Sequence, residues 1–295
     1  MNLSLPRSFP IAKAALAAAV IACVVALTCS LTGCASGGTD SSSADADNTS
    51  ASTDGKTLRV AMELAYPPFE TKDDAGNPEG LAVDFIRDFG AAYGYDVQIE
   101  NTAWDGLIPS LQSDKADLVI SSMTITDERK QSVDFSDAYA MAQLAILANA
   151  NSGVASIDDL NQPGKKVAVK TGSTGDVYAT KNLTNAEIVR LADESACVTE
   201  VVQGKADGFL YDQLTIYRNH QANPDTTEAV FIPFQDAEEW GIAVKKGNTE
   251  LLDQLNAFIA QSKTDGEFDR LTEKYLADEK KAFDQYGFKW FFDFE

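Results

Sequence analysis

Segments typical of β-strands alternate with amphipathic segments along the chain from Lys56 onward. The strand-like runs are "TLRVAME", "DVQIEN" and "ADLVISS", and between them lie the helical patterns "LAVDFIRDFGAAYG" and "WDGLIPSLQSDK". The same order restarts after Ala140 with "AQLAILANA", "KKVAVKTG", "EIVRLAD" and "ADGFLYD". It ends with one strand, "WGIAVKKGN", and two helices, "TELLDQLNAFIAQSK" and "GEFDRLTEKYLADEKKAF". This alternation predicts an α/β protein with parallel sheets covered by helices on both faces.

The two halves of the pattern resemble each other. Each has a helix with a polar end, followed by a short strand that starts with Ala-Asp. Hydroxyl residues follow the strand in the first half, and Asp212 ends the strand in the second. In open α/β sheets, ligands bind at the carboxyl ends of the strands. Two such edges that face each other would form a cleft.

The first edge carries an arginine close to a group of hydroxyls. Thr126 can N-cap a short helix that contains Arg129, and a guanidinium matches the geometry of a carboxylate. A surface arginine paired with Asp127 or Asp134 is the other interpretation. The hydroxyls are either ligand contacts or ordinary turn residues; they belong to Ser121, Ser122 and Thr124.

The second edge contains the stretch "KTGSTGD", Lys170 to Asp176. Its glycines allow a tight turn, and Ser173 or Thr174 would cap the helix that follows. A helix N-terminus with free N–H groups can bind an anion, whereas a capped helix after a glycine turn needs no ligand. The spacing is not that of a P-loop.

Three further positions suit a small zwitterion. Asp212 either caps a helix or offers its carboxylate to an ammonium group. "ELAYPPFE" contains Glu63 and Tyr66 at the end of a strand, and its prolines restrict where the aromatic rings point. Trp104 is either a packing residue or a wall of the cleft.

The first 55 residues do not share the strand–helix alternation of the rest of the chain. Residues 1–33 contain two basic residues and then a long apolar run, which predicts a secretory signal, although a single membrane span is the alternative. "LTGC" resembles the lipobox of bacterial lipoproteins, in which the cysteine, here Cys34, becomes lipidated. Residues 34–56 are small and polar and predict a flexible tether. With Cys23 and Cys29 in the signal and Cys34 lipidated, only Cys197 is left as a free thiol, an apolar helix residue without a disulfide partner.

The chain is strongly acidic. Its formal charge is −21, which becomes −23 once Arg7 and Lys13 leave with the signal. This charge opposes binding to nucleic acid or to anionic lipid headgroups. The single histidine and the lack of a cysteine pair predict no metal site and no cofactor.

In order, "LRVAMELAYPPFE", "GLAVDFIRD", "WDGLIPSLQSDKADLVISSMTITDERKQSVDFSDAY", "VAVKTGSTGD", "GKADGFLYD" and "GIAVKKGN" resemble the extracellular solute-binding proteins of family 3. The resemblance covers Thr57 to about Leu276. It implies a lipoprotein that delivers a polar or basic amino acid, or cystine, to an ABC permease and its ATPase subunit, and that acts as a monomer. The implied fold is two-lobed and of the periplasmic-binding-protein type II, with an open, mostly parallel sheet flanked by helices in each lobe and a hinge between them. The lobes are expected at 57–140 for lobe 1 and 141–239 for lobe 2, with 240–295 returning to lobe 1.

The resemblance also implies roles for single residues. Arg129 and Thr124 would hold the α-carboxylate of the ligand with help from Ser122 and the helix start at Ser173–Thr174, and Asp212 would hold its α-ammonium. Tyr66 and Trp104 would sandwich the ligand side chain, and Glu63 would contact its polar end. Ser121 and Lys170 stand at positions that commonly line the pocket in this family.

Other functions use the same residues differently. Ser173, Asp212 and His220 follow the order of an α/β-hydrolase triad, but Thr171 stands where "G-x-S-x-G" needs glycine. A cyclohexadienyl dehydratase of the same fold would use Glu63 as its acid. A ligand sensor would need a separate signalling partner. The aromatic tail, "FDQYGFKWFFDFE", exceeds the usual family length, and we expect it to pack against lobe 1.

Overall fold

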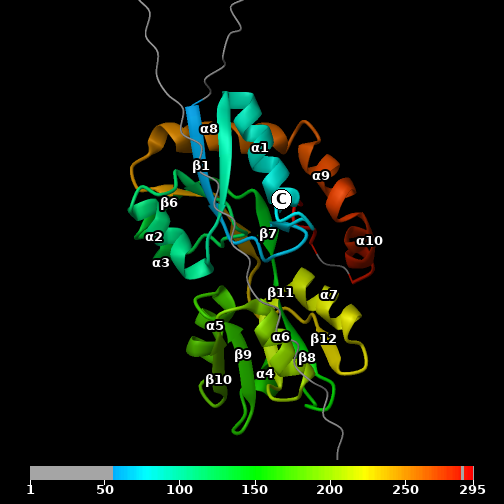
Figure 1. The fold of residues 1–295 in the computed structure, drawn as a ribbon. Coiled ribbons are helices and arrows are strands. Elements are labelled where there is room, and N and C mark those ends of the chain that lie inside the picture. The colour runs from blue at the N-terminus through cyan, green and yellow to red at the C-terminus, as the bar shows by residue number, and fades with distance from the viewer. Residues whose placement is uncertain (1–55, 287–288, 295) are drawn as a thin grey trace, which may run out of the picture. The chain divides into compact units, whose positions relative to one another are not determined.

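The computed structural model describes residues 56–286 and 289–294 (Figure 1). The predicted signal, Cys34 and all of the tether except Lys56 lie outside the described residues. Two five-stranded sheets organise the described part, and two short strands connect them. None of the helices in this part is both long and apolar enough to span a bilayer.

Lobe 1 is built on the sheet with strand order β4-β1-β5-β14-β6. β1 pairs in parallel with β4 and β5, whereas β14 is antiparallel to β5 and β6. The bounds of these strands are β1 Lys56–Met62, β4 Tyr95–Asn101, β5 Leu118–Val119, β6 Val133–Phe135 and β14 Ala243–Lys245.

Helices cover both faces of the lobe 1 sheet because successive residues of a strand point to opposite sides. Val60 packs with α1, α8 and α9, whereas the neighbouring Ala61 packs with α2. The bounds of these helices are α1 Leu81–Tyr93, α2 Leu107–Gln112, α8 Thr249–Ser262 and α9 Glu267–Tyr275. A 3₁₀ turn at Trp104–Gly106 precedes α2, so the helix predicted over 104–115 is shorter and starts in a tighter form.

Lobe 2 is built on the sheet β10-β9-β11-β8-β12. β9 is parallel to β10 and β11, and β8 is antiparallel to β11 and β12. Two helices pack on each face: α6 and α7 on one, α4 and α5 on the other. The bounds are β8 Leu144–Asn149, α4 Ile157–Leu160, β9 Lys166–Lys170, α5 Thr174–Asn182, β10 Glu187–Leu191, α6 Glu194–Val202, β11 Gly208–Asp212, α7 Gln213–Ala222 and β12 Thr227–Val230.

The chain passes between the lobes along two antiparallel strands, β7 (Ala140–Ala142) and β13 (Glu238–Trp240). The sequence predicted one strand over 240–248, and this was wrong: β13 pairs with β7, whereas β14 joins the lobe 1 sheet. Gly241 lies between them and packs against Ile125, since a Cβ at Gly241 would stand 2.8 Å from that side chain. The missing side chain lets the crossing strand approach lobe 1 closely.

The C-terminal helix pattern also divides into two helices. α9 ends at Tyr275 and α10 runs over Ala277–Tyr286, with Leu276 fully buried between them. Beyond α10, Trp290 and Phe291 lie in the lobe 1 core with 4% and 0% of their surface exposed. The carbonyl of Phe291 accepts a hydrogen bond of 2.7 Å from the N–H of Met141, so the tail is attached to crossing strand β7.

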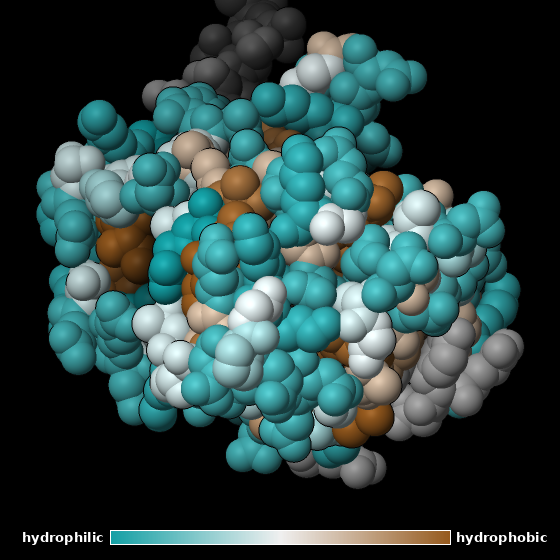
Figure 2. Space-filling view, turned by 90° about the horizontal axis from the view of Figure 1, so that it is seen from below, coloured by the Kyte–Doolittle hydropathy of each residue, from teal (hydrophilic) through white to brown (hydrophobic). Residues whose placement is uncertain are grey.

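The surface of lobe 2 matches the acidic, polar composition of the chain. Figure 2 shows the molecule from the side on which lobe 2 lies in Figure 1, and hydrophobic residues occur there as separate spots between hydrophilic ones. Among the described residues, the exposed large hydrophobic side chains are Tyr93, Val177 and Ile232.

Candidate ligand-binding site

A small cavity of about 40 Å³ is lined by residues from both lobes and from strand β13. It lies where β1, β5 and β11 end, as expected for a ligand site of open α/β sheets. Ten of the eleven predicted ligand residues line it: Glu63, Tyr66, Trp104, Ser121, Ser122, Thr124, Arg129, Ser173, Thr174 and Asp212. The eleventh, Lys170, contacts the cavity through Glu63.

Arg129 is directed inward by its local structure. It belongs to α3 (Asp127–Lys130), whose N-cap Thr126 accepts a hydrogen bond of 3.2 Å from the Arg129 N–H. The guanidinium donates to the carbonyl of Thr124 (2.7 Å) and, across the cleft, to that of Gly172 (3.1 Å). Burial lowers the pKa of Arg129. The alternative of an exposed ion pair with a nearby aspartate is therefore wrong.

Gly172 permits this arrangement through its backbone. Its φ is +74°, a region that residues with a side chain rarely adopt, and an added Cβ would lie 3.5 Å from the Trp104 indole nitrogen. The Trp104 ring in turn lies under two cations: Arg129 and Lys170 are each 5.2 Å from its centroid. Trp104 thus lines the cavity, with both cations over its ring.

Glu238 occupies the corner next to Arg129, and the sequence did not predict this. Its Oε2 accepts hydrogen bonds from Thr124 Oγ1 (2.9 Å) and Thr174 Oγ1 (2.7 Å), and its Oε1 accepts one from Gln235 (2.7 Å). Burial raises the pKa of Glu238, while these hydrogen bonds and the charge of Arg129 act in the opposite direction.

Lys170 and Glu63 form an ion pair beside the cavity. Lys170 comes from lobe 2 and only 4% of it is exposed, whereas Glu63 follows β1 in lobe 1. The N–H of Glu63 donates to Ser121 Oγ (2.9 Å), which holds the backbone beside the pair. Glu63 thus presents an acceptor to the cavity, and the buried Lys170 balances its charge.

Asp212 has two different oxygens. Oδ1 caps α7, since it accepts from the N–H groups of Leu214 (2.9 Å) and Thr215 (3.1 Å). Oδ2 is buried and, among the described residues, makes no hydrogen bond of full geometry, although the hydroxyls of Tyr66 and Thr215 act on the Asp212 carboxylate and lower its pKa. Burial raises the pKa of Asp212. Asp212 therefore caps α7, as one interpretation expected, whereas a contact between its other oxygen and a cationic ligand group stays a prediction.

Two more acidic residues, Glu70 and Glu194, lie close enough to Asp212 for its charge to affect their pKa. Glu70 is 1% exposed, accepts a hydrogen bond of 3.1 Å from Ser122 Oγ, and has a pKa well above its usual range because of burial. Glu194, at the start of α6, has its pKa raised to about 8 by burial and then by the charge of Asp212. Ser122 has a φ of +47°, a strained conformation for serine that is typical of functional sites.

The sequence missed several lining residues: Glu70, Leu144, Tyr211, Trp240 and the contacting Glu238. Glu70 stands in the same "YPPFE" stretch as Tyr66, so its position was a usable signal. Trp240 and Glu238 lie at the second crossing between lobes, where the chain must pass the cleft. The sequence predicts the second crossing near Glu239 but assigns no role to its side chains.

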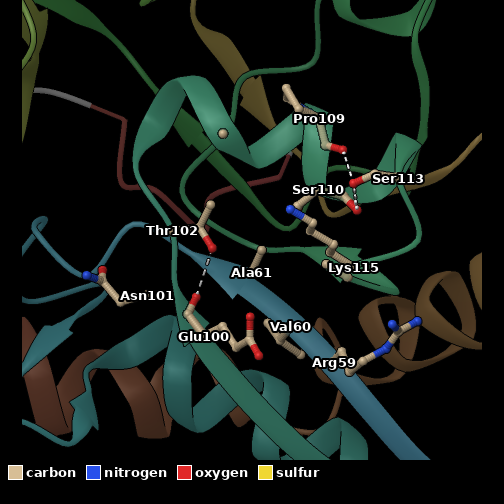
Figure 3. Close-up of a pocket in the computed structure, with 12 residues that line it drawn as sticks. Arg59, Val60, Ala61, Glu100, Asn101, Thr102, Pro109, Ser110, Ser113 and Lys115 are labelled. Atoms are coloured by element: carbon tan, nitrogen blue, oxygen red, sulfur yellow. Dashed lines mark hydrogen bonds between the residues drawn. The ribbon is translucent and has the colours of Figure 1, made fainter.

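A second groove, of about 360 Å³, lies on lobe 1 between β1, β4 and α2 (Figure 3). Its polar groups are used locally: Ser113 Oγ donates to the carbonyl of Pro109 (2.7 Å), and Thr102 Oγ1 to that of Glu100 (3.3 Å). Arg59 forms an ion pair with Asp117 (2.6 Å). Several polar groups of this groove are therefore already paired with neighbouring residues, so it is a weaker candidate for a ligand site than the cavity between the lobes.

The hydrolase-like residues are not assembled as a triad. Ser173 Oγ accepts from the N–H of Asp176 (3.2 Å) as the N-cap of α5. His220 Nδ1 lies 3.3 Å from Thr227 Oγ1, eight residues or about 12 Å along α7 from Asp212. Within residues 56–286 and 289–294, no group of three or more histidine, cysteine or acidic side chains is placed to hold a metal ion.

Comparison with known proteins identifies the family to which the chain belongs. The model of the bacterial extracellular solute-binding proteins, family 3, matches residues 58–278. A probable histidine-binding protein of Neisseria gonorrhoeae is 36% identical over 76% of this chain and 85% of its own length. The L-cystine-binding protein TcyJ of Escherichia coli is 32% identical over 75% and 82%. The structure of an ancestral arginine-binding protein bound to arginine has a TM-score of 0.69 at 37% identity, covering 75% of this chain and 98% of that one.

Proposed function

The chain belongs to family 3 of the bacterial extracellular solute-binding proteins, and on that basis we propose that its cavity captures a free L-amino acid for import through an ABC permease. The ligand class is a polar or basic amino acid, or cystine. Cys34 would carry the lipid that anchors the protein at the outer face of the cell membrane, with residues 34–56 as the tether. The permease and its ATPase subunit would be the protein partners.

The observation that carries the proposal is the buried Oδ2 of Asp212, which makes no hydrogen bond of full geometry among the described residues. A buried carboxylate oxygen without a hydrogen-bond partner is costly, and an α-ammonium group would satisfy it. Arg129 lines the same cavity with its guanidinium oriented by two carbonyls, Thr124 and Gly172. An anion site and a cation site in one small cavity match the two ends of a zwitterion.

The ion pair of Lys170 and Glu63 beside the cavity restricts the side chains that a ligand can carry. The pair of Lys170 and Glu63 offers both a positive and a negative charge, so its net charge is close to zero. A side chain that can donate and accept would exchange bonds with both partners. This favours an amide, an imidazole or the second amino-acid head of cystine over a plain ammonium, whose charge Lys170 opposes.

Calorimetric titration of refolded, ligand-stripped residues 56–295 against the twenty amino acids, cystine and ornithine tests the proposal. We expect tight binding of one polar member, and its recovery unchanged after incubation. Chemical conversion of the ligand would favour an enzyme of the dehydratase type. No binding across the panel would contradict the proposal and favour the sensor alternative.

A further inference from the structure

The corner that surrounds Arg129 is already engaged by a carboxylate of the chain itself. Thr124, Thr174 and Arg129 are the groups expected to hold a ligand carboxylate, and all three act on Glu238. Both hydroxyls donate to the same oxygen, Oε2, at 2.9 and 2.7 Å, and the charge of Arg129 acts on the same side chain. The side chain of Glu238 thus stands where an external carboxylate would be bound.

The donors cannot serve two carboxylates at once. A threonine hydroxyl carries a single hydrogen, so a bond from Thr124 or Thr174 to Glu238 excludes a simultaneous bond to a ligand. Two ionised carboxylates in one small site also repel each other. A ligand carboxylate that binds in this corner must therefore take these hydrogen bonds from Glu238.

Glu238 is held in this place by its backbone. It belongs to crossing strand β13, which runs beside residues 123–125: the N–H of Ile125 donates to the carbonyl of Glu239 (2.8 Å), and that of Gly241 to Met123 (3.0 Å). The neighbouring Glu239 side chain is exposed. Thr124 belongs to lobe 1 and Thr174 to lobe 2, so the Glu238 carboxylate connects the two lobes directly.

We propose that Glu238 is a tethered competitor that determines affinity and specificity: its carboxylate occupies the Thr124–Thr174 corner until a ligand carboxylate displaces it. This inference rests on the proposed function, because it concerns the same cavity. It assigns to a crossing-strand residue a role in selecting ligands. Only ligands whose own carboxylate binds this corner better than Glu238 are captured.

The test is calorimetric titration of wild type, Glu238→Ala, Glu238→Gln and the control Glu239→Gln. The control removes one negative charge from the adjacent residue of the same strand without touching the corner. The ligands are the amino acid found in the panel above and its decarboxylated amine. Circular dichroism and melting curves establish that each variant is folded, and Glu238→Gln keeps the shape of the side chain should the alanine variant fail to fold.

We expect Glu238→Ala to bind the amino acid more tightly by on the order of 10- to 100-fold, the range for hydrogen bonds to charged groups. Glu238→Gln should bind it more tightly by a smaller factor, because the amide oxygen still accepts from the threonines but lacks the charge. Glu239→Gln should be unchanged, and the amine should gain nothing from either Glu238 variant.

Three results separate the possibilities. If wild type binds an amino acid and neither Glu238 variant binds it more tightly, the inference is wrong while the proposed function stands. If wild type binds the amine at least as tightly as the amino acid, Glu238 is a permanent part of the site and the competitor role is excluded. If neither wild type nor the variants bind any amino acid, both proposals fail together, whereas binding by the variants alone supports the competitor role.

Discussion

Trp240 separates two regions of opposite chemistry. One is the cavity, which Trp240 lines together with Tyr66, and whose polar groups bond to one another across the lobes. The other is the aromatic tail, where Phe291 packs 5.5 Å from Trp240 and 5.2 Å from Phe69, ring centroid to ring centroid. Trp240 is 3% exposed and Phe291 0%.

The difference shows how one wall can serve stability and binding. Burial of the apolar rings on the tail side stabilises the folded protein, so we expect this side to hold Trp240 in place. Bonds on the cavity side can be exchanged for those of a ligand at little net cost, because each lost bond is replaced. Mutations should therefore affect unfolding on one side and affinity on the other.

The largest effect is expected on the tail side. Phe291→Ala should lower the free energy of unfolding by about 3–5 kcal/mol, since it leaves a cavity among buried rings. Removal of Ala282–Glu295 should lower the melting temperature at least as much. Denaturant unfolding measures the effect, and Phe294→Ala, at a partly buried ring, is the control with a smaller loss. An unchanged melting temperature after the truncation would show that the tail does not support lobe 1.

The largest effect on the cavity side is expected from Arg129→Ala. Loss of the guanidinium should weaken amino-acid binding by about 2–5 kcal/mol, the range for a buried charged partner. The change in melting temperature should be much smaller than for Phe291→Ala. Titration calorimetry measures the affinity, and Arg87→Ala, at an exposed arginine, is the control. Affinity within about tenfold of wild type would remove Arg129 from the site.

Asp212→Asn should separate stability from ligand affinity at a single residue. The amide oxygen can still cap α7, so the helix start is retained. Affinity for an amino acid should fall by about 1–3 kcal/mol because the ammonium loses a charged partner. Stability near pH 8 should be equal or higher, because a buried carboxylate with a raised pKa is no longer present. Equal affinity of variant and wild type would place the ammonium site elsewhere.

The smallest effect concerns pH. The pKa of Glu194 is raised to about 8 from an ordinary value of 4.5, so the folded protein holds a proton that the unfolded chain releases. This contribution is fully present below pH 4.5 and is lost as pH rises through about 8. The melting temperature of wild type should therefore fall by a few degrees relative to Glu194→Gln over this range. Parallel pH curves for the two proteins would contradict the shift.

Much of the fold and of the site could be read from local patterns. The spacing of apolar residues predicted the alternation of strands and helices, and the capping residues Thr126 and Ser173 bond as their sequence positions predicted. The site residues at the ends of strands were found because parallel strands bring these ends to one edge. The ligand role predicted for Arg129 came from the family resemblance, since its spacing alone favoured a surface ion pair.

Other features depend on contacts between distant residues. Glu238 meets Thr124 across 114 positions and Thr174 across 64, so no local window contains the corner that they form. The division of the predicted strand at Gly241, like that of the last helix at Leu276, follows from packing against other elements.

The sequence by itself determined the secondary-structure order and most residues that line the cavity, because periodicity and capping act over a few residues. Only the tertiary structure decided which polar groups meet: Lys170 with Glu63, Glu238 with two threonines, and one oxygen of Asp212 that makes no hydrogen bond of full geometry within the part of the chain that the structure describes. Electrostatic pairing depends on distance in space, and the two crossing strands set that distance.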